Sequence, residues 1–369
     1  MGDNTLGRKF RITSFGESHG KVVGVVIDGT PAGLKIDLDY IQSELNKRKP
    51  GVSSFTTARK EQDKVEVLSG IFNGRTTGAP ICLIIKNQDV DSSNYEKSRN
   101  LLRPSHADYT SLQKFGGFAD YRGSGRFSGR ITAAFVMAGA IAKQILSKVK
   151  ISIIAYTKSI GNVEDNKEYS VDDFEPLLQR RKNSLVGALD LEVSKKMENL
   201  IEFAKKSNDS VGGTIRCIIN NVPPGIGGPI FNSLESNISK GVFSIPAIKG
   251  IEFGAGFDAS RMKGSEHNDP WTIKNGKIKT IKNDSGGIIG GISTGMPIVF
   301  NVAVKPTPSI GKIQKTVNIK TMEEDTITIE GRHDPCIVPR AIVVVESITA
   351  LVILDFLLIE GKILSVLKD

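Results

Sequence analysis

The chain has 369 residues, enough for one large α/β or α+β unit with a sizeable buried core, and this size excludes a disulfide-stapled miniprotein. Hydrophobic residues make up 39% and charged residues 24%, the balance of a soluble globular protein rather than a disordered or fibrous one. With 49 basic and 40 acidic residues, the net charge of +9 favours an anionic partner: nucleic acid, acidic lipid or a phosphorylated small molecule.

The N-terminal segment and the cysteines indicate the compartment. Residues 1–20 contain no apolar signal core, so we expect no export. Cys82, Cys217 and Cys336 are odd in number and form no CxxC pair, which favours a reducing, cytoplasmic compartment over disulfides or structural zinc.

The first histidine, His19, lies in the segment GESHG at residues 16–20, whose glycines leave the backbone free to approach a ligand. The segment also matches the G-x-S-x-G pattern of α/β-hydrolases. Only fifteen residues precede it, too few for the parallel strands that such a nucleophile needs, so a hydrolase is disfavoured. Further along, residues 45–51 form a basic helix end that contains Arg48; ligand binding and a favourable helix-dipole charge are equally open there.

An internal repeat organises the chain. Gly70–Ile81 recurs as Gly287–Ile298 at an offset of 217 (291 − 74), and each copy enters a β-type apolar run. Residues 22–48 resemble residues 213–241 at an offset of 192 (223 − 31), so the second copy holds 25 extra residues between Ile226 and Gly287. We predict a single domain over 1–369 with related halves at roughly 1–150 and 211–369, a connector at 151–210, and an α+β fold with antiparallel sheets.

Three helices are predicted from apolar patterning. Residues 131–149 close the first half, and an amphipathic helix covers 191–206 in the connector. The run 341–361 is apolar enough to suggest a membrane span, but Glu346 and Asp355 interrupt it. A buried helix or helix-strand pair is therefore expected, with no membrane partner.

The densest anion-binding signal is residues 122–130 (RGSGRFSGR), which run directly into the helix at 131–149. Glycines expose backbone N–H groups, the helix N-terminus adds positive charge, and guanidiniums grip phosphate or carboxylate. A basic, solvated turn is the plain alternative. Residues 305–309 (KPTPS) could likewise hold a phosphate or form an ordinary loop.

Two further histidines lie between arginine and aspartate: His106 within residues 103–108 and His333 within 331–336. Either could be a structural, hydrogen-bonded residue, but the shared context favours chemistry. Cys336 has no activating neighbour in sequence and is expected to serve packing. No Walker A, G-x-G-x-x-G or H-E-x-x-H motif is present, so metal catalysis is disfavoured.

Together these motifs resemble the chorismate synthase family. Residues 16–20, 122–130 and 331–341 are similar to its three signatures, and segments such as LNKRKPG, RPSHADYT and KPTPSI follow in its order. The resemblance implies a β-α-β sandwich with helices packed between antiparallel sheets. It also implies a carbon–oxygen lyase of the shikimate pathway of aromatic amino acid biosynthesis. In its reaction, 5-enolpyruvylshikimate 3-phosphate loses phosphate from C3 and hydrogen from C6 by anti-1,4-elimination and becomes chorismate.

The family requires reduced FMN although the reaction has no net redox change, and it implies a homotetramer. No dinucleotide-binding domain is recognisable, so we expect an external flavin reductase; NADPH remains open only as a flavin reductant.

Residue roles also follow from the resemblance. His19 would protonate the departing phosphate, His106 would interact with the flavin near N1 and the C2 carbonyl, and Asp334 would assist proton removal at flavin N5. Arg48, Arg130 and Arg332 resemble substrate-facing arginines. Positions that match FMN-binding ones are Arg48, Arg126, Phe127, Ser128, Gly129, Ala247, Gly290, Lys305, Pro306, Thr307, Pro308, Ser309 and Arg332.

Some positions depart from the family pattern. Phe127 stands where a small residue is common and Ile131 where a glutamate is common. Ser54 replaces an arginine, Ser105 a glycine, and Pro246 an asparagine that would supply an amide to the flavin. A function of another class, a basic nucleic-acid-binding protein, is the alternative; the single tryptophan and six tyrosines give it few stacking residues.

Overall fold

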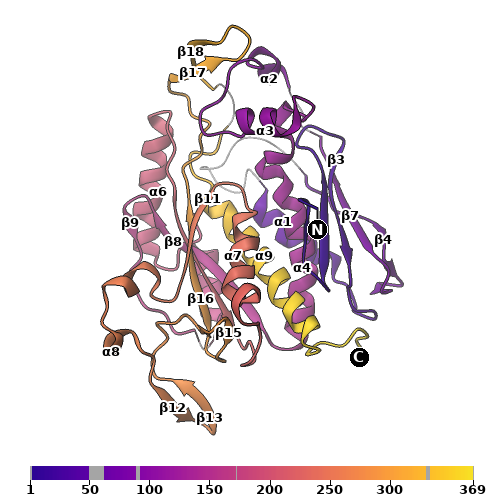
Figure 1. The fold of residues 1–369 in the computed structure, drawn as a ribbon, viewed down its shortest axis with the longest axis vertical. Helices are drawn as coiled ribbons and strands as arrows, with labels where there is room; N and C mark the ends of the chain where they lie inside the picture. Colours follow the sequence, from indigo (N-terminus) through magenta and orange to yellow (C-terminus); the bar gives the residue numbers. More distant parts are fainter. Residues whose placement is uncertain (1, 50–61, 89–91, 172, 330–332, 369) are drawn as a thin grey trace.

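The computed structural model describes residues 2–49, 62–88, 92–171, 173–329 and 333–368, so Ser54 and Arg332 lie outside the described residues. Two five-stranded antiparallel sheets enclose a layer of helices (Figure 1). The first sheet has the order β1 (Thr5–Leu6), β2 (Arg11–Gly16), β3 (Val22–Asp28), β7 (Ile81–Lys86) and β4 (Glu66–Ser69). The second has the order β11 (Ile248–Phe253), β16 (Ile298–Val304), β10 (Gly213–Asn220), β8 (Ser152–Ile160) and β9 (Val163–Glu164).

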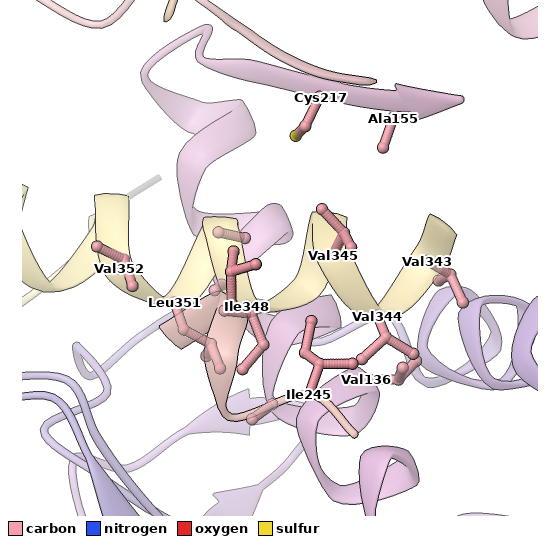
Figure 2. Packing of buried hydrophobic residues seen from close by; sticks show 14 of the residues in the cluster. Val136, Ala155, Cys217, Ile245, Val343, Val344, Val345, Ile348, Leu351 and Val352 are labelled. Atoms are coloured by element: carbon pink, nitrogen blue, oxygen red, sulfur yellow. The ribbon is translucent and has the colours of Figure 1, made fainter. Parts of the chain in front are cut away.

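Four helices fill the space between the sheets: α1 (Leu38–Arg48), α4 (Thr132–Lys148), α7 (Leu234–Phe243) and α9 (Val338–Ile359). Helices α4 and α9 cross at Gly139, where a side chain would meet Ser347 at 2.3 Å, so only glycine permits this approach. Figure 2 shows valines of α9 packed towards Val136 of α4 on one side and Cys217 of the second sheet on the other. The predicted α+β fold with helices between antiparallel sheets is thus confirmed.

The repeat found in the sequence has matching local structure. Hairpin β5–β6 (Ile71–Phe72 and Arg75–Thr76) corresponds to β14–β15 (Ile288–Ile289 and Ile292–Ser293). The Thr76 hydroxyl donates to the Pro31 carbonyl at 2.6 Å and accepts from the Leu34 N–H at 3.0 Å. The Ser293 hydroxyl makes the equivalent bonds to Pro223 and Ile226 at 2.5 and 2.9 Å. The two copies therefore use one hydroxyl to tie the hairpin to the strand–Pro-x-Gly segment.

The strand orders of the two sheets also correspond. Strands β2-β3-β7-β4 occupy the positions that β8-β10-β16-β11 occupy in the second sheet. Strands β8 and β9 both lie within 151–210, so the segment assigned as a connector contributes two strands to the second sheet. The single-domain organisation itself stays a prediction.

The two acidic residues of the apolar run are accommodated within one helix, α9. Asp355 accepts the backbone N–H groups of Arg8, Lys9 and Phe10 at 2.7–3.0 Å, and Glu346 joins a buried ion cluster. Helices at Gly129–Lys148 and Val338–Ile359 are long and apolar enough to cross a membrane, but 72% and 94% of their most apolar windows are buried inside the fold. They behave as core helices.

The extra residues of the second half include α8 (Gly264–His267) and the hairpin β12–β13 (Trp271–Lys274 and Lys277–Thr280), which projects from the lower end of the molecule (Figure 1). The predicted amphipathic helix is α6 (Leu191–Lys206). The remaining helices and strands are α2 (Ser93–Lys97), α3 (Asp108–Phe115), α5 (Glu175–Lys182), β17 (Gln314–Asn318) and β18 (Glu323–Ile327).

Candidate active site

Three helix ends converge on one region of the molecule. Arg48 in the last turn of α1 donates from Nε to the hydroxyl of Thr132, the first residue of α4, at 2.9 Å. Arg340 in the first turn of α9 donates to the Arg48 carbonyl at 2.9 Å. The N-termini of α4 and α9 add partial positive charge here, which suits an anionic ligand.

His19 is buried in the loop between β2 and β3. Its Nδ1 lies 2.8 Å from the Ser92 hydroxyl, and its ring meets Tyr95 edge-on at 5.3 Å. Gly123, in the arginine-rich loop, presses its backbone against this ring: an added Cβ would lie 2.2 Å from Cδ2, and its φ of 57° is left-handed. The glycine of that loop therefore positions the histidine.

Arg48 and Arg130 meet at one carboxylate. Both are buried, and both donate to Asp63, Arg48 at 3.3 Å and Arg130 in a shorter contact. Arg130 Nε also donates to Asn87 Oδ1 at 3.0 Å, while Asn87 Nδ2 donates to the carbonyls of Glu17 and Gly20 on either side of His19. Asn87 thus connects the histidine loop to the arginine pair.

Asp334 joins the same network from the α9 side. Its carboxylate accepts from Arg340, the residue that also holds the Arg48 carbonyl. The structure therefore joins Arg48, Arg130 and Asp334 in one chain of hydrogen bonds, and Asn87 connects that chain to the loop that holds His19. The predicted substrate-binding residue Arg332 lies outside the described residues.

His106 forms a second cluster with the KPTPS loop. Its Nδ1 lies 3.0 Å from the Pro104 carbonyl, which can only accept, so this nitrogen carries the proton. Its Nε2 lies 2.9 Å from the Ser309 hydroxyl. Burial, reinforced by the charge of Arg103, lowers the pKa of His106 to about 4, so the ring is neutral near pH 7.

Lys305 and Arg103 connect this second cluster to its surroundings. The Nζ atom of Lys305 donates to the Ser105 carbonyl, and the backbone N–H of Lys305 donates to the Ala247 carbonyl, both at 2.9 Å. Arg103 pairs with Asp108, donates to Ser124 of the arginine-rich loop at 3.0 Å, and lies over the Tyr95 ring. Because Tyr95 contacts His19, both clusters belong to one site.

Comparison with known proteins identifies the family. Its sequence model, described as chorismate synthase, matches residues 10–358. Chorismate synthase of Dehalococcoides mccartyi is 53% identical over 99% of this chain and 100% of its own length, and that of Korarchaeum cryptofilum is 50% identical over 97% and 98%. The chain belongs to the chorismate synthase family.

A crystal structure of chorismate synthase superposes with a TM-score of 0.76 at 30% identity, covering 96% of this chain and 93% of the other. The family's enzymes are carbon–oxygen lyases of the shikimate pathway.

A cavity of about 940 Å³, large enough for the flavin that chorismate synthases use, is lined by Glu17 of the histidine loop and by the end of the arginine-rich loop, but by none of His19, Arg48, Arg130, Asp334, His106 or the KPTPS loop. Both halves line it, among others through Phe15, Phe127 and Pro246. Arg126 also lines it, but its guanidinium is held by acceptors of Asn4, Ser14 and Gly16. At the KPTPS loop, Thr307 Oγ1 is buried with no hydrogen bond to the described part of the chain. An orphaned hydroxyl between Lys305 and Ser309 fits a phosphate group.

Not every expected flavin residue of this chorismate synthase family member gathers there. Ser128 and Gly129 serve the arginine pair: the Ser128 hydroxyl accepts from the Arg130 N–H, and the Gly129 carbonyl accepts from Arg48. Gly290 precedes Gly291, whose carbonyl accepts the N–H of Leu234 at the start of α7, whereas Ala247 follows the end of α7. Helix α7 has ten residues and is about 15 Å long, so Gly290 and Ala247 lie at opposite ends of it. Within one chain, Gly290 therefore does not reach the KPTPS loop.

Several site residues were not singled out by sequence: Asp63, Asn87, Ser92, Tyr95 and Arg340. Arg340 lies within the third signature, six positions after Asp334, and its place in the first helical turn after a loop was the available signal. Cys336 is buried, and burial raises the pKa of its thiol to about 12, which agrees with packing rather than nucleophilic chemistry.

Proposed function

We propose that the chain catalyses the anti-1,4-elimination of phosphate and the C6 hydrogen from 5-enolpyruvylshikimate 3-phosphate, giving chorismate, with reduced FMN and no net redox change. The observation that carries the proposal is the network that links the loop holding His19, the Arg48–Arg130 pair and Asp334. When bound, reduced FMN supplies an electron-rich ring next to the substrate and the nitrogen N5, which takes part in breaking the C6–H bond.

The arginine pair binds an anionic group of the substrate, and His19 donates a proton to the departing phosphate. Protonation lowers the cost of expelling a multiply charged anion, and a positioned general acid typically contributes about 10²–10⁴-fold in rate. The Ser92 hydroxyl and the Gly123 backbone fix the ring. Burial in this loop keeps water from competing for that proton.

The two other ionisable groups act on the flavin side. His106, neutral and protonated on Nδ1, presents the Nε2 edge to Ser309 and orients the KPTPS loop, whose Lys305, Thr307 and Ser309 would hold the flavin phosphate. Asp334, whose carboxylate accepts a hydrogen bond from Arg340, would assist proton removal at flavin N5.

The surroundings of the reaction are part of the same proposal. The enzyme works in the cytoplasm as a homotetramer and receives its reduced FMN from a separate reductase rather than reducing it with NADPH. Turnover supported by NADPH without added reductase would overturn that last statement. We do not propose nucleic-acid binding.

The test is an anaerobic assay with photoreduced FMN. We expect chorismate and phosphate to appear together, and only when the flavin is reduced. Absence of product with reduced flavin would refute the proposal. His19→Ala and His106→Ala should each lower turnover by several orders of magnitude while flavin still binds. Wild-type rates in both variants would refute the assigned roles.

A further inference from the structure

Asp63 occupies the centre of the arginine pair. Its side chain has no exposed surface, Oδ2 accepts from Arg48 Nη1 at 3.3 Å, and Oδ1 accepts from Arg130 Nη1 in a shorter contact. Two guanidiniums therefore converge on the two oxygens of one carboxylate. The arginines come from α1 and from the arginine-rich loop, so the carboxylate joins parts of the chain that are far apart in sequence.

The backbone of Asp63 is placed by α1 itself. The side chain of Gln42 donates from Nε2 to the Asp63 carbonyl and accepts the Val65 N–H with Oε1, both at 3.1 Å. Asp63 has a φ of 48°, a left-handed conformation that such a clamp can maintain. Because Gln42 and Arg48 share α1, one helix fixes both the carboxylate and the first guanidinium.

Neutral acceptors in the described part of the chain also bind the two guanidiniums. Arg48 donates to the Thr132 hydroxyl and the Gly129 carbonyl, both at 2.9 Å, and Arg130 Nε donates to Asn87. These acceptors orient each group but do not offset the repulsion between two cations in a buried site. Asp63 brings a negative charge to both arginines at once and so offsets the repulsion between them.

We propose that Asp63 is a positioning residue for substrate binding: it holds Arg48 and Arg130 in one fixed pair that receives an anionic group, carboxylate or phosphate, of the substrate. Asp63 does not itself touch the substrate. The inference rests on the proposed function, because it takes the arginine pair as the substrate's anion site.

The first test compares Asp63→Asn with the wild type. Amide replacement keeps the size of the side chain and removes its charge, so the guanidiniums separate. The dissociation constant for 5-enolpyruvylshikimate 3-phosphate, measured by calorimetry with oxidised FMN present so that no turnover occurs, should rise at least tenfold, and KM should rise with it. The change in kcat should be smaller, and FMN affinity should stay within twofold. Asp258→Asn, which breaks an exposed pair with Arg261, is the control and should change none of these.

A double-mutant cycle separates positioning from a general structural role. In an Arg130→Lys background the fork that Asp63 holds is already lost, so adding Asp63→Asn should weaken substrate binding less than threefold further. Gln42→Met leaves every charge in place and removes only the backbone clamp. It should raise the dissociation constant about threefold, and it serves as the deciding variant if Asp63→Asn does not fold.

Three outcomes decide the matter. An unchanged substrate dissociation constant in folded Asp63→Asn, or in Gln42→Met where that variant decides, overturns the inference. Equal effects of Asp63→Asn with and without Arg130→Lys also overturn it. A wild-type protein that neither binds nor converts the substrate would refute the proposed function, a result distinct from normal wild-type binding with insensitive variants.

Discussion

Two groups of buried charges lie along α1 and are built differently. In the first, one turn before Arg48, Glu44 shares Lys143 with Glu346, and Glu346 also pairs with Arg181; half-exposed Lys47 lies at the edge. In the second, two arginines share Asp63. In the first group, acidic and basic side chains pair with one another between the sheets and join α1, α4, α5 and α9.

The second group places two guanidiniums where three helix ends meet. One arrangement serves packing, and the other suits an anionic ligand.

The electrostatics of Glu346 support this contrast. Burial opposes ionisation of Glu346, but the charges of Arg181 and Lys143 outweigh it and hold the pKa of the carboxyl well below its ordinary value. Its Oε1 also accepts the Ala155 N–H at 2.8 Å, so the helix layer is tied to the second sheet. Glu346 stays charged because Lys143, Arg181 and the Ala155 N–H all bind its carboxylate.

The largest expected effect is on stability. Glu346→Ala leaves Lys143 and Arg181 buried without their shared carboxylate, which typically costs about 3–5 kcal/mol in unfolding free energy. Urea unfolding followed by circular dichroism measures this loss. Glu202→Ala, which breaks the exposed pair with Lys206, should leave the midpoint unchanged. A loss in Glu346→Ala as small as that of the control would show that the first cluster does not stabilise the fold.

The next effect is on turnover and separates Arg340 from Asp63. Arg340→Ala releases Asp334 and the Arg48 carbonyl, and misplacement of a reacting group by about 1 Å can cost about 10²-fold. We expect kcat to fall about 10–100-fold with little change in KM, the opposite split from Asp63→Asn. Steady-state kinetics with reduced FMN measures both constants. A rise in KM alone would place Arg340 with the binding groups instead.

A pH effect on stability should follow from the first cluster. The folded-state pKa of Glu346 lies below its ordinary value of 4.5, so the unfolded chain takes up this proton first as the pH falls. The stability that Glu346 contributes is therefore present above pH 4.5 and is lost as the pH falls further. The difference in unfolding free energy between the wild type and Glu346→Gln should shrink from pH 6 to pH 3. A difference that stays constant would contradict this assignment.

The smallest predicted signal concerns His106 alone. Its pKa of about 4 lies below the ordinary 6.5, so its imidazole should not titrate between pH 8 and pH 5. Nitrogen-15 NMR of the ring should show the Nδ1–H tautomer throughout this range. A titration near pH 6.5 would mean that the ring is not buried against the KPTPS loop.

Much of the fold could be predicted because its signals are local or repeated. The duplicated hairpins at 70–81 and 287–298 share both sequence and hydrogen bonds, and the apolar run after residue 341 became α9. The roles of Asp63 and Glu346 could not be predicted. Asp63 lies 15 residues from Arg48 and 67 from Arg130, and Glu346 lies 203 residues from Lys143, so no local pattern connects these charges.

The candidate site shows the same division. The glycine-rich arginine loop and the histidine segments were visible as motifs, whereas their assembly depends on tertiary contacts such as Gly123 against His19. Gly290 shows the opposite case. Its position in the sequence matches an FMN-binding position of the family, but within one chain it lies at the opposite end of α7 from the site.

The central claim is that flavin and substrate bind side by side, the substrate at the arginine pair where α1, α4 and α9 converge and the flavin phosphate at the KPTPS loop. A flavin difference spectrum tests it most directly: FMN is bound to the protein, and 5-enolpyruvylshikimate 3-phosphate is then added. The account predicts that the substrate perturbs the isoalloxazine bands in the wild type, and that Asp63→Asn requires at least tenfold more substrate for the same change. Flavin bands that do not respond to saturating substrate would contradict it.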